Sequence, residues 1–202
     1  MKTPFEIINP APLAAGRAPN SFCLVAEHLE DNKPPRALQA PNIIGIDLGI
    51  AGAVALLSAA GDLVEVADMP ALRDGFGGRA AVNASLLAGL LARWHAREVV
   101  CEFVSARPKE GAVGAFSFGR SRGVIEGACA ALGLPIRLLT PAAWKRAVGL
   151  PVGRDRAKDA ARSEAIRRWP AHAGLFARVR DDGRAEAALI GLAGLKREGR
   201  NV

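Results

Sequence analysis

Two short apolar runs in this sequence each carry one acidic residue near their C-terminal end. Residues 42–48 form the first run, which contains Asp47 and is followed by a glycine-containing turn. Residues 98–104 form the second run, and Glu102 lies near its end. Apolar, β-branched runs of this length, bounded by turn signals, are typical of buried strands. We therefore expect two strands that deliver Asp47 and Glu102 to the same edge of a sheet.

The pattern around these runs predicts an α/β chain. Residues 53–58 are expected to fold back antiparallel on the first strand, and residues 62–69 alternate as an edge strand. Apolar residues at helical spacing predict an amphipathic helix over 80–96. The remaining patterns predict a helix from about 120 to 132, a strand over 134–139, a short helix capped by Thr140 that begins at Pro141, a helix over 155–168 and a last helix from about 180 to 193.

The first 41 residues differ in composition from the rest of the chain. They contain seven of the thirteen prolines and only one short apolar patch. Such a segment favours a flexible or extended arm, with an added strand or an early start codon as alternatives. Residues 42–202 are long enough for one domain with one good core, and no internal repeat is visible.

Cysteine usage and hydropathy exclude secreted and membrane-spanning classes of protein. Cys23, Cys101 and Cys129 lack metal-ligand spacing, and three thiols cannot all pair with one another. No apolar run approaches the roughly 18 to 20 residues of a membrane span, and no secretion signal opens the chain. We therefore expect a cytoplasmic protein with reduced thiols and no contact with a membrane.

Positive charge is concentrated in the second half of the chain. Lys and Arg number 27 against 20 Asp and Glu. Fifteen of these basic residues, but only five of the acidic ones, lie between Arg107 and Arg180. A basic segment enclosed by acids favours a polyanion held over a metal site. An ordinary solvated surface explains the same charge equally well.

The last predicted helix carries two acidic residues four positions apart. Asp182 and Glu186 therefore lie on the same helical face, where like charges repel. Acidic residues also stabilise a helix N-terminus, which is the simpler explanation for Asp181 and Asp182. Glu186 lies inside an otherwise apolar helix and needs a cationic partner.

Carboxylates collected at one edge of a sheet need a compensating cation. Burying a carboxylate costs several kcal/mol unless a metal, a cation or hydrogen bonds compensate it. Two neighbouring strand acids therefore favour a cation between Asp47 and Glu102. Oxygen ligands without a Cys or His cluster select Mg²⁺ or Mn²⁺ over zinc. For Asp47 taken alone, capping of the turn is an equally good explanation.

Several motifs, in this order along the chain, resemble a known family. The matching stretches are residues 45–49 with Gly52-Ala53, then Glu102 followed by Phe118-Gly119, Pro141 with Trp144-Lys145, Lys158-Asp159, and residues 182–187. Over residues 42–195 the chain is similar to the RuvC-type Holliday junction resolvases of the ribonuclease H-like superfamily. The four-residue spacing of Asp182 and Glu186 resembles the phage-like and plastid-like branch of that family.

The resemblance implies a five-stranded mixed β-sheet flanked by α-helices, and a homodimer whose two active sites cut a four-way DNA junction. Two divalent ions about 3.5 to 4 Å apart suit the hydrolysis of a phosphodiester. We expect two Mg²⁺ ions per active site, with Mn²⁺ as a substitute. The ligands that we assign are Asp47 as the bridging residue, Glu102 on one ion, and Asp182 with Glu186 on the other. In this family pattern Asp181 is a less suitable substitute for Asp182.

Basic and aromatic residues are expected to contact the DNA. By similarity Lys158 offsets charge on the phosphate and joins the catalytic set, with Lys145 as a weaker candidate for the same role. Arg120 and Arg122 suit phosphate contacts at the start of a helix. The full set predicted to contact DNA is Phe116, Phe118, Arg120, Arg122, Lys145, Arg146 and Lys158. For the two phenylalanines, packing in the core is the alternative to base stacking.

Two other functions stay open on the sequence alone. An RNA-processing nuclease of the same fold would have the same acids and the same basic charge. A junction-binding protein without catalysis would keep the charge but would not need all four acids. An ATPase of the actin-like fold would require a second copy of the fold, for which the chain is too short.

Overall fold

The computed structural model of the protein describes residues 42–73, 78–103, 111–152 and 159–198. The expected arm at residues 1–41 lies outside the described residues. The same is true of two residues singled out from the sequence, Cys23 and Lys158.

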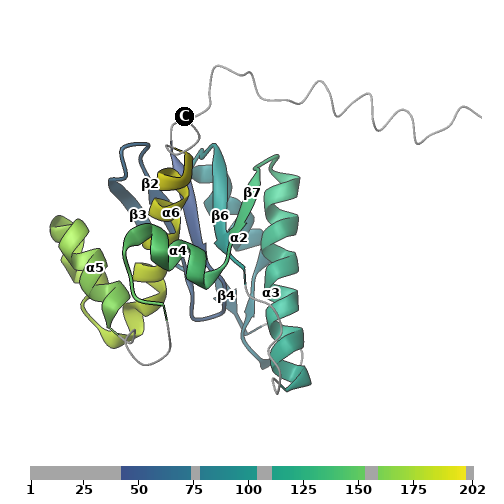
Figure 1. Cartoon of the computed structure of the whole chain (residues 1–202). Helices are drawn as coiled ribbons and strands as arrows, with labels where there is room; N and C mark the ends of the chain where they lie inside the picture. Colours follow the sequence, from purple (N-terminus) through teal and green to yellow (C-terminus); the bar gives the residue numbers. More distant parts are fainter. Residues whose placement is uncertain (1–41, 74–77, 104–110, 153–158, 199–202) are drawn as a thin grey trace, which may run out of the picture. The chain divides into compact units, whose positions relative to one another are not determined.

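A five-stranded mixed sheet forms the centre of the fold (Figure 1). Its strands are β1 (Ile43–Asp47), β2 (Ala53–Leu57), β3 (Leu63–Asp68), β6 (Glu98–Glu102) and β7 (Ile136–Leu139), in the spatial order β3-β2-β1-β6-β7. β1 pairs antiparallel with β2 and parallel with β6, and β6 pairs parallel with β7. The predicted mixed sheet is confirmed, as is the edge position of β3.

The helix expected over residues 80–96 is shorter than predicted, because a strand takes its first residues. β5 (Ala81–Val82) pairs antiparallel with β4 (Ala71–Leu72). Helix α2 (Ala84–Arg93) begins after Asn83, whose side chain accepts a hydrogen bond at 3.0 Å from the backbone N–H three residues later. The polar cap at Asn83 therefore determines where the helix starts. The spacing of the apolar residues had predicted a start that is too early.

Helix α3 (Ala112–Ala131) begins eight residues before the expected start near Arg120. Gly111 precedes the helix and offers no side chain to cap it, so no local start signal was present in the sequence. Arg120 and Arg122 consequently lie in the middle of α3. The expectation that they stand at a helix N-terminus is wrong.

Within the described residues, three α-helices follow β7, and two of them have a boundary signal that the sequence predicts. Helix α4 (Pro141–Val148) begins after Thr140, whose side chain accepts a hydrogen bond from a backbone N–H at 3.3 Å. Helix α5 (Ala160–Arg168) ends before Trp169-Pro170. The other elements in this part are two short 3-10 helices, η3 (Pro170–Phe176) and η4 (Val179–Asp181), and the last helix, α6 (Asp182–Glu198).

Helices cover both faces of the sheet (Figure 1). On one face, α4, α5 and α6 pack against residues such as Ile43 and Leu57. On the other face, α2 and α3 pack against residues such as Ile44 and Val54. Successive residues of a strand point to opposite faces. Because both faces are covered, the central strands are continuous apolar runs without alternation.

The two cysteines within the described residues lie in the core. Cys101 and Cys129 are free and buried. Burial raises the pKa of the Cys129 thiol to about 11 and that of Cys101 further, so both stay protonated and unreactive near neutral pH. None of the described helices combines the length and the apolar character needed to cross a membrane.

Helix α6 lies very close to the centre of the sheet. A β-carbon on Gly45 of β1 would be 2.1 Å from the carbonyl oxygen of Ala187 and 2.5 Å from the backbone nitrogen of Gly191. Both distances are far below van der Waals contact, so only glycine fits between this strand and this helix. The contact holds α6 against β1 and sets where its first turn lies.

Candidate active site

Two parallel strands end side by side at one edge of the sheet. β1 and β6 pair in register, with Ile46 opposite Cys101. Asp47 and Glu102 are the next residues of the two strands. Neighbouring strands lie about 4.8 Å apart, so the register brings the two acids to adjacent points at the same edge.

The start of α6 lies against the same strand end. A β-carbon on Gly183 would be 3.1 Å from Asp47 Oδ2 and 2.7 Å from the carbonyl oxygen of Ala51. Asp182 directly precedes this glycine, and Glu186 lies one helical turn after Asp182. The close approach at Gly183 therefore brings the acids of α6 to the edge where β1 ends.

The pKa values of two of these acids reflect their proximity. Burial raises the pKa of Asp47 well above its usual value, and the negative charges of Glu186 and Glu102 raise it further. Burial also raises the pKa of Glu186; Lys145 opposes this shift, while Glu102 and Asp182 add to it. The four carboxylates therefore form one electrostatically coupled, negatively charged cluster, of the kind that attracts a cation.

Helix α4 supplies two neighbours to this acidic cluster. The indole Nε1 of Trp144, which is fully buried, donates a hydrogen bond to Glu102 Oε1 at 2.9 Å. The next residue, Lys145, places its Nζ 3.9 Å from Glu186 Oε1. Lys145 is therefore the cationic partner that Glu186 was expected to need. Trp144 orients the carboxylate of Glu102.

Helix α5 supplies a second cation. Arg162 Nε lies 2.8 Å from Asp182 Oδ1, and the same guanidinium binds Asp159. Asp182 Oδ1 is buried and accepts no aligned hydrogen bond within the described ranges. Nowhere in those ranges do three His, Cys, Asp or Glu side chains stand close enough to hold a metal ion together. In this state Asp182 is therefore held by a guanidinium.

Since the sequence predicts that Glu102 binds a metal ion, we predict that Trp144→Phe reduces both metal affinity and any cleavage activity by about tenfold, the contribution typical of a group that orients a metal ligand. Trp169→Phe is the matched control, since Trp169 is also buried and donates its indole N–H to the carbonyl of Gly61 at 3.0 Å, away from the acids. Mn²⁺ titration and cleavage rates measure the effect. Equal losses in the two variants would show that Trp144 acts only through stability.

The structure separates the roles of the two adjacent aspartates at the start of α6. Asp181 is 2% exposed. It accepts hydrogen bonds from the backbone N–H of Arg178 at 2.9 Å and from the Arg178 guanidinium at 2.8 Å. The Arg178 side chain holds the pKa of Asp181 at about 2, well below its usual value. Asp181 thus closes the turn before α6. Of the two aspartates, only Asp182 belongs to the acidic cluster.

We predict that Asp181→Asn destabilises the fold in a pH-dependent way. Because the folded-state pKa of Asp181 is depressed to about 2, its stabilising effect is complete above the unfolded pKa of about 3.9 and is lost as pH falls towards 2. Urea unfolding should give a constant difference from the unsubstituted protein between pH 7 and 5, and a shrinking difference below pH 4. An unchanged difference at pH 3 would contradict this role.

The residues of α3 that were predicted to contact DNA differ in how available they are. Phe116 is 74% exposed and Phe118 is 40% exposed, so the alternative of core packing is wrong for Phe116. Arg120 is exposed and pairs with none of the described residues. Arg122 is instead paired with Glu126 at 2.7 Å. Phe116 and Arg120 are thus the members of this group best placed to contact a ligand.

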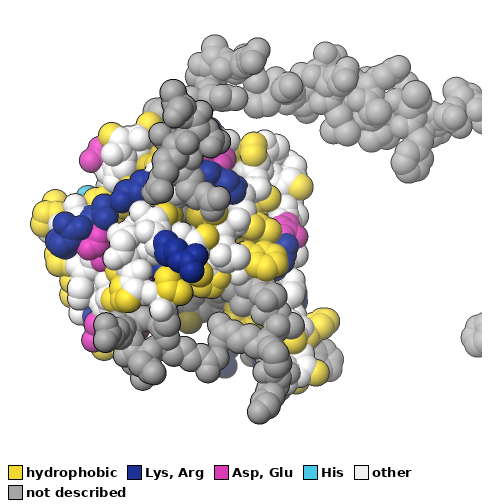
Figure 2. All heavy atoms as spheres, viewed as in Figure 1, with side chains coloured by type: hydrophobic (Ala, Val, Ile, Leu, Met, Phe, Trp, Pro, Cys, Tyr) yellow, Lys and Arg dark blue, Asp and Glu magenta, His cyan; other side chains and the backbone are white. Residues whose placement is uncertain are grey.

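The predicted basic residues near the acids also fall into separate groups. Lys145, the weaker candidate from the sequence, lies inside the acidic cluster. Arg146 is exposed on the same helix. Figure 2 shows Lys and Arg side chains on the face that carries α4 and α5. Lys158 lies outside the described residues.

Sequence analysis missed the contacts that Trp144 and Arg162 make with the acids. Both residues lie within helices that the sequence predicts, but no local pattern gives them a partner. Thr140-Pro141 marked the start of α4, and this start places Trp144 within the first turns of a helix that follows β7. The crossing of α4 over the end of β6 is a tertiary feature, and no local pattern encodes it.

The architecture belongs to the ribonuclease H-like class of α/β folds, with a five-stranded mixed sheet between helices. Two solved structures of RuvC from Thermus thermophilus have a similar fold. RuvC in complex with a Holliday junction substrate matches with a TM-score of 0.56 at 17% identity, over 79% of this chain and 96% of that chain. The second RuvC structure matches with a TM-score of 0.54 at 21% identity, over 78% and 96%. No family model and no curated protein sequence matches the chain.

Proposed function

We propose that the protein is a structure-selective endodeoxyribonuclease that resolves four-way DNA junctions as a homodimer. The observation that carries this proposal is the acidic cluster of Asp47, Glu102, Asp182 and Glu186 at one edge of a RuvC-like sheet. Three separate elements bring these acids together: two parallel strands and the last helix. Repelling carboxylates collected in this way, with a basic surface nearby, suit a metal-dependent reaction on a polyanion.

The donor set fits divalent Mg²⁺ or Mn²⁺. All four side chains offer carboxylate oxygens, which these ions prefer. Asp182 Oδ1 is buried beside Arg162 Nε at 2.8 Å without an aligned hydrogen bond, so a metal ion would take the place of the guanidinium there. Arg162 and Lys145 offset only part of the negative charge. Binding of two ions would require Arg162 to release Asp182.

The residues would then divide the work of phosphodiester hydrolysis. Two bound ions would supply an activated water and stabilise charge on the reacting phosphate. Asp47 would bridge the ions, Glu102 would hold one, and Asp182 with Glu186 would hold the other. Trp144 would keep the Glu102 carboxylate oriented. The ammonium groups of Lys145 and Lys158 would face the phosphate and offset its charge.

DNA binding is assigned to exposed basic and aromatic residues of α3 and α4. Phe116, Phe118, Arg120 and Arg146 have exposed side chains, so they are available for phosphate or base contacts. Arg122 takes part only if it leaves Glu126. A place in the phage-like and plastid-like branch of the resolvases belongs to the same proposal and rests on the spacing of Asp182 and Glu186.

Incubation of purified protein with labelled DNA of defined shapes tests this function. Four-way, Y-shaped and linear duplex DNA, and a four-way RNA, are compared in Mg²⁺ and in EDTA. We expect symmetric cuts in two strands of the four-way DNA, only with metal. Cleavage of linear duplex as fast as of the junction would overturn the resolvase assignment, and preference for the RNA would favour an RNA-processing nuclease.

A junction-binding protein without catalysis is the second candidate. The ion pair between Arg162 and Asp182 favours it, because a guanidinium holds an acid that the nuclease would need for metal. The same experiment separates the two functions. Tight binding of four-way DNA without cleavage, at saturating Mg²⁺ and Mn²⁺, would establish this alternative.

A further inference from the structure

A fork of two hydrogen bonds joins the first turn of α6 to the end of β3. Arg184 Nε donates to Asp68 Oδ1 at 2.5 Å, and Arg184 Nη2 donates to Asp68 Oδ2 at 2.7 Å. A planar guanidinium matches a carboxylate in this paired geometry, so the contact is directional as well as attractive. The hydrogen bonds from Arg184 hold the pKa of Asp68 below its usual value. The pair therefore stays charged near neutral pH.

Asp68 lies in the same row of the sheet as Asp47. Asp68 of β3 pairs with Ala53 of β2, and Ala53 pairs with Asp47 of β1. Directly paired residues of antiparallel strands point to the same face of a sheet, so both aspartates point to the face that α6 covers. Two strand spacings separate their backbones, which is about 10 Å. A contact with Asp68 therefore fixes α6 close to the strand end that carries Asp47.

Arg184 stands between the two acids of α6 in sequence but on another side of the helix. Asp182 precedes it by two residues and Glu186 follows it by two, and residues two apart on a helix do not share a face. The acids therefore face the cluster while Arg184 reaches β3. On the cluster side, Gly183 lies against the carbonyl oxygen of Ala51. Contacts on two sides of this turn leave it little freedom to shift.

The fork is part of a chain of alternating charges. Arg184 Nη1 lies 3.8 Å from Asp181 Oδ1, and Asp181 is in turn paired with Arg178 at 2.8 Å. Isolated ion pairs on a surface contribute little to stability, whereas forked pairs and networks of charges are the exceptions. Asp68, Arg184, Asp181 and Arg178 combine both features. They link the end of β3, the first turn of α6 and the residues just before it.

We propose that Arg184 and Asp68 are positioning residues, which hold the first turn of α6 so that its two acids stand at the ion site beside Asp47. Neither residue would touch the ions, because both act through the backbone of α6. The proposal rests on the proposed function, since it names what keeps that metal site in shape. It gives a role to the arginine between Asp182 and Glu186, which the metal site itself does not use.

Titration with Mn²⁺, followed by electron paramagnetic resonance, measures this effect without DNA and without cleavage. Arg184→Gln and Asp68→Asn should each lower the affinity for Mn²⁺ by about tenfold, because loss of a group that orients a metal ligand typically costs that much or more. The double variant should also lose about tenfold, since either change alone already breaks the fork.

An effect of charge alone would have a different signature. Arg184→Gln would then raise the affinity for Mn²⁺, because it removes a positive charge near the acids, and only Asp68→Asn would lower it. Opposite signs in the two variants would therefore overturn the positioning role. Affinities equal to that of the unsubstituted protein would overturn it as well.

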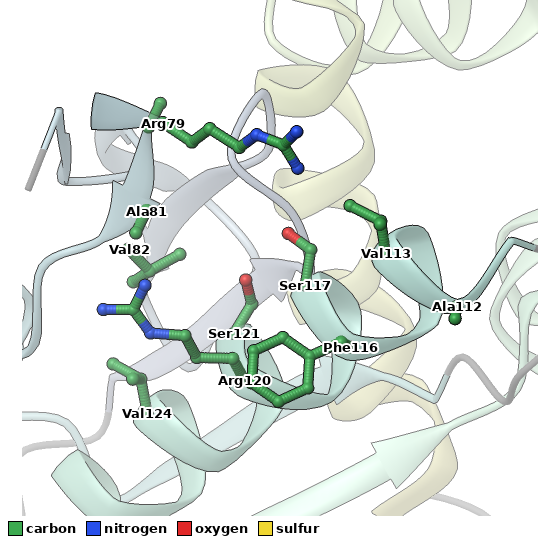
Figure 3. Close-up of a pocket in the computed structure, with 11 residues that line it drawn as sticks. Arg79, Ala81, Val82, Ala112, Val113, Phe116, Ser117, Arg120, Ser121 and Val124 are labelled. Atoms are coloured by element: carbon green, nitrogen blue, oxygen red, sulfur yellow. The ribbon is translucent and has the colours of Figure 1, made fainter. Parts of the chain in front are cut away.

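Arg93→Gln is the matched control. Arg93 of α2 pairs at 2.7 Å with Glu65, which belongs to the same strand as Asp68, but α2 covers the other face of the sheet. This variant should keep the affinity for Mn²⁺, and its urea midpoint should shift as little as that of Arg184→Gln, because both pairs lie at the surface. Neither pair lines the pocket of about 810 Å³ shown in Figure 3, whose lining residues lie in α3 and in residues 79–82. The substitutions therefore leave that surface of α3 unchanged.

Hydrogen exchange in EDTA provides a second measurement, which needs no metal. Arg184→Gln should speed exchange of the backbone amides within residues 184–188 relative to Arg93→Gln, and should leave the second half of α6 unchanged. Equal exchange in the two variants would overturn the proposal. If the unsubstituted protein bound no Mn²⁺, the proposal and the metal-dependent nuclease would both fall. If it bound Mn²⁺ and the variants of the fork bound it equally well, only the positioning role would fall.

Discussion

Asp47→Asn and Glu186→Gln are each expected to abolish cleavage of four-way DNA, with a loss of at least about 10³-fold in rate. Both changes keep side-chain size and remove the negative charge that would hold a divalent ion. Metal ions contribute several kcal/mol to such reactions, and each 1.36 kcal/mol is tenfold in rate. Cleavage rates at saturating Mg²⁺ measure the effect.

Binding of the junction in EDTA should survive in both variants or become tighter. The acidic cluster repels DNA when no metal is bound, so removing one charge weakens that repulsion. Asp62→Asn is the control, because Asp62 lies in the turn between β2 and β3, at the opposite end of β2 from Asp47, where it accepts a hydrogen bond from the Ser58 hydroxyl. A variant of Asp47 or Glu186 that still cut at the rate of the control would refute the assignment.

Gly45→Ala should lower the free energy of unfolding by about 3 kcal/mol or more, because overpacking of a tight core has costs of this size. The added methyl would lie 2.1 Å from the carbonyl oxygen of Ala187 and 2.5 Å from the backbone nitrogen of Gly191. Backbone atoms cannot rotate away, so α6 must move off the sheet. For a chain of this length, thermal unfolding should shift down by about 10 °C.

The same substitution at Gly127 is the matched control for Gly45→Ala. A β-carbon on Gly127 meets no atom within 4 Å, and the residue lies in the exposed part of α3. Gly127→Ala should therefore raise the unfolding free energy by about 0.5 to 1 kcal/mol, because alanine is the better helix former. If Gly45→Ala were tolerated as well as Gly127→Ala, α6 would not need this close contact with β1.

The central sheet was predictable because its signals are local. Strands covered on both faces are continuous apolar runs, and β1 and β6 were found from such runs. The start of α4 was found because Thr140 and Pro141 form a strong cap signal. The start of α3 was missed because Gly111 provides no cap, and tertiary packing determines that boundary.

The candidate site was predictable only in part, for a similar reason. The acids stand out because carboxylates are rare at the ends of apolar strands and inside an apolar helix. Their partners do not stand out, since Arg162 and Trp144 reach the acids through the packing of α5 and α4. Asp181 and Asp182 are adjacent and chemically identical, so only the contacts with Arg178 and Arg162 separate their roles.

Diffraction from crystals grown with Mn²⁺, recorded at the manganese absorption edge, tests most directly whether four carboxylates form a metal site. We predict two anomalous peaks about 3.5 to 4 Å apart. Asp47 should bridge them, with Glu102 on one ion and Asp182 with Glu186 on the other, and Arg162 turned away from Asp182. The opposite result is a crystal at saturating Mn²⁺ with no anomalous peak at these residues and with Arg162 still bound to Asp182. That result would contradict the proposal that the protein is a metal-dependent nuclease.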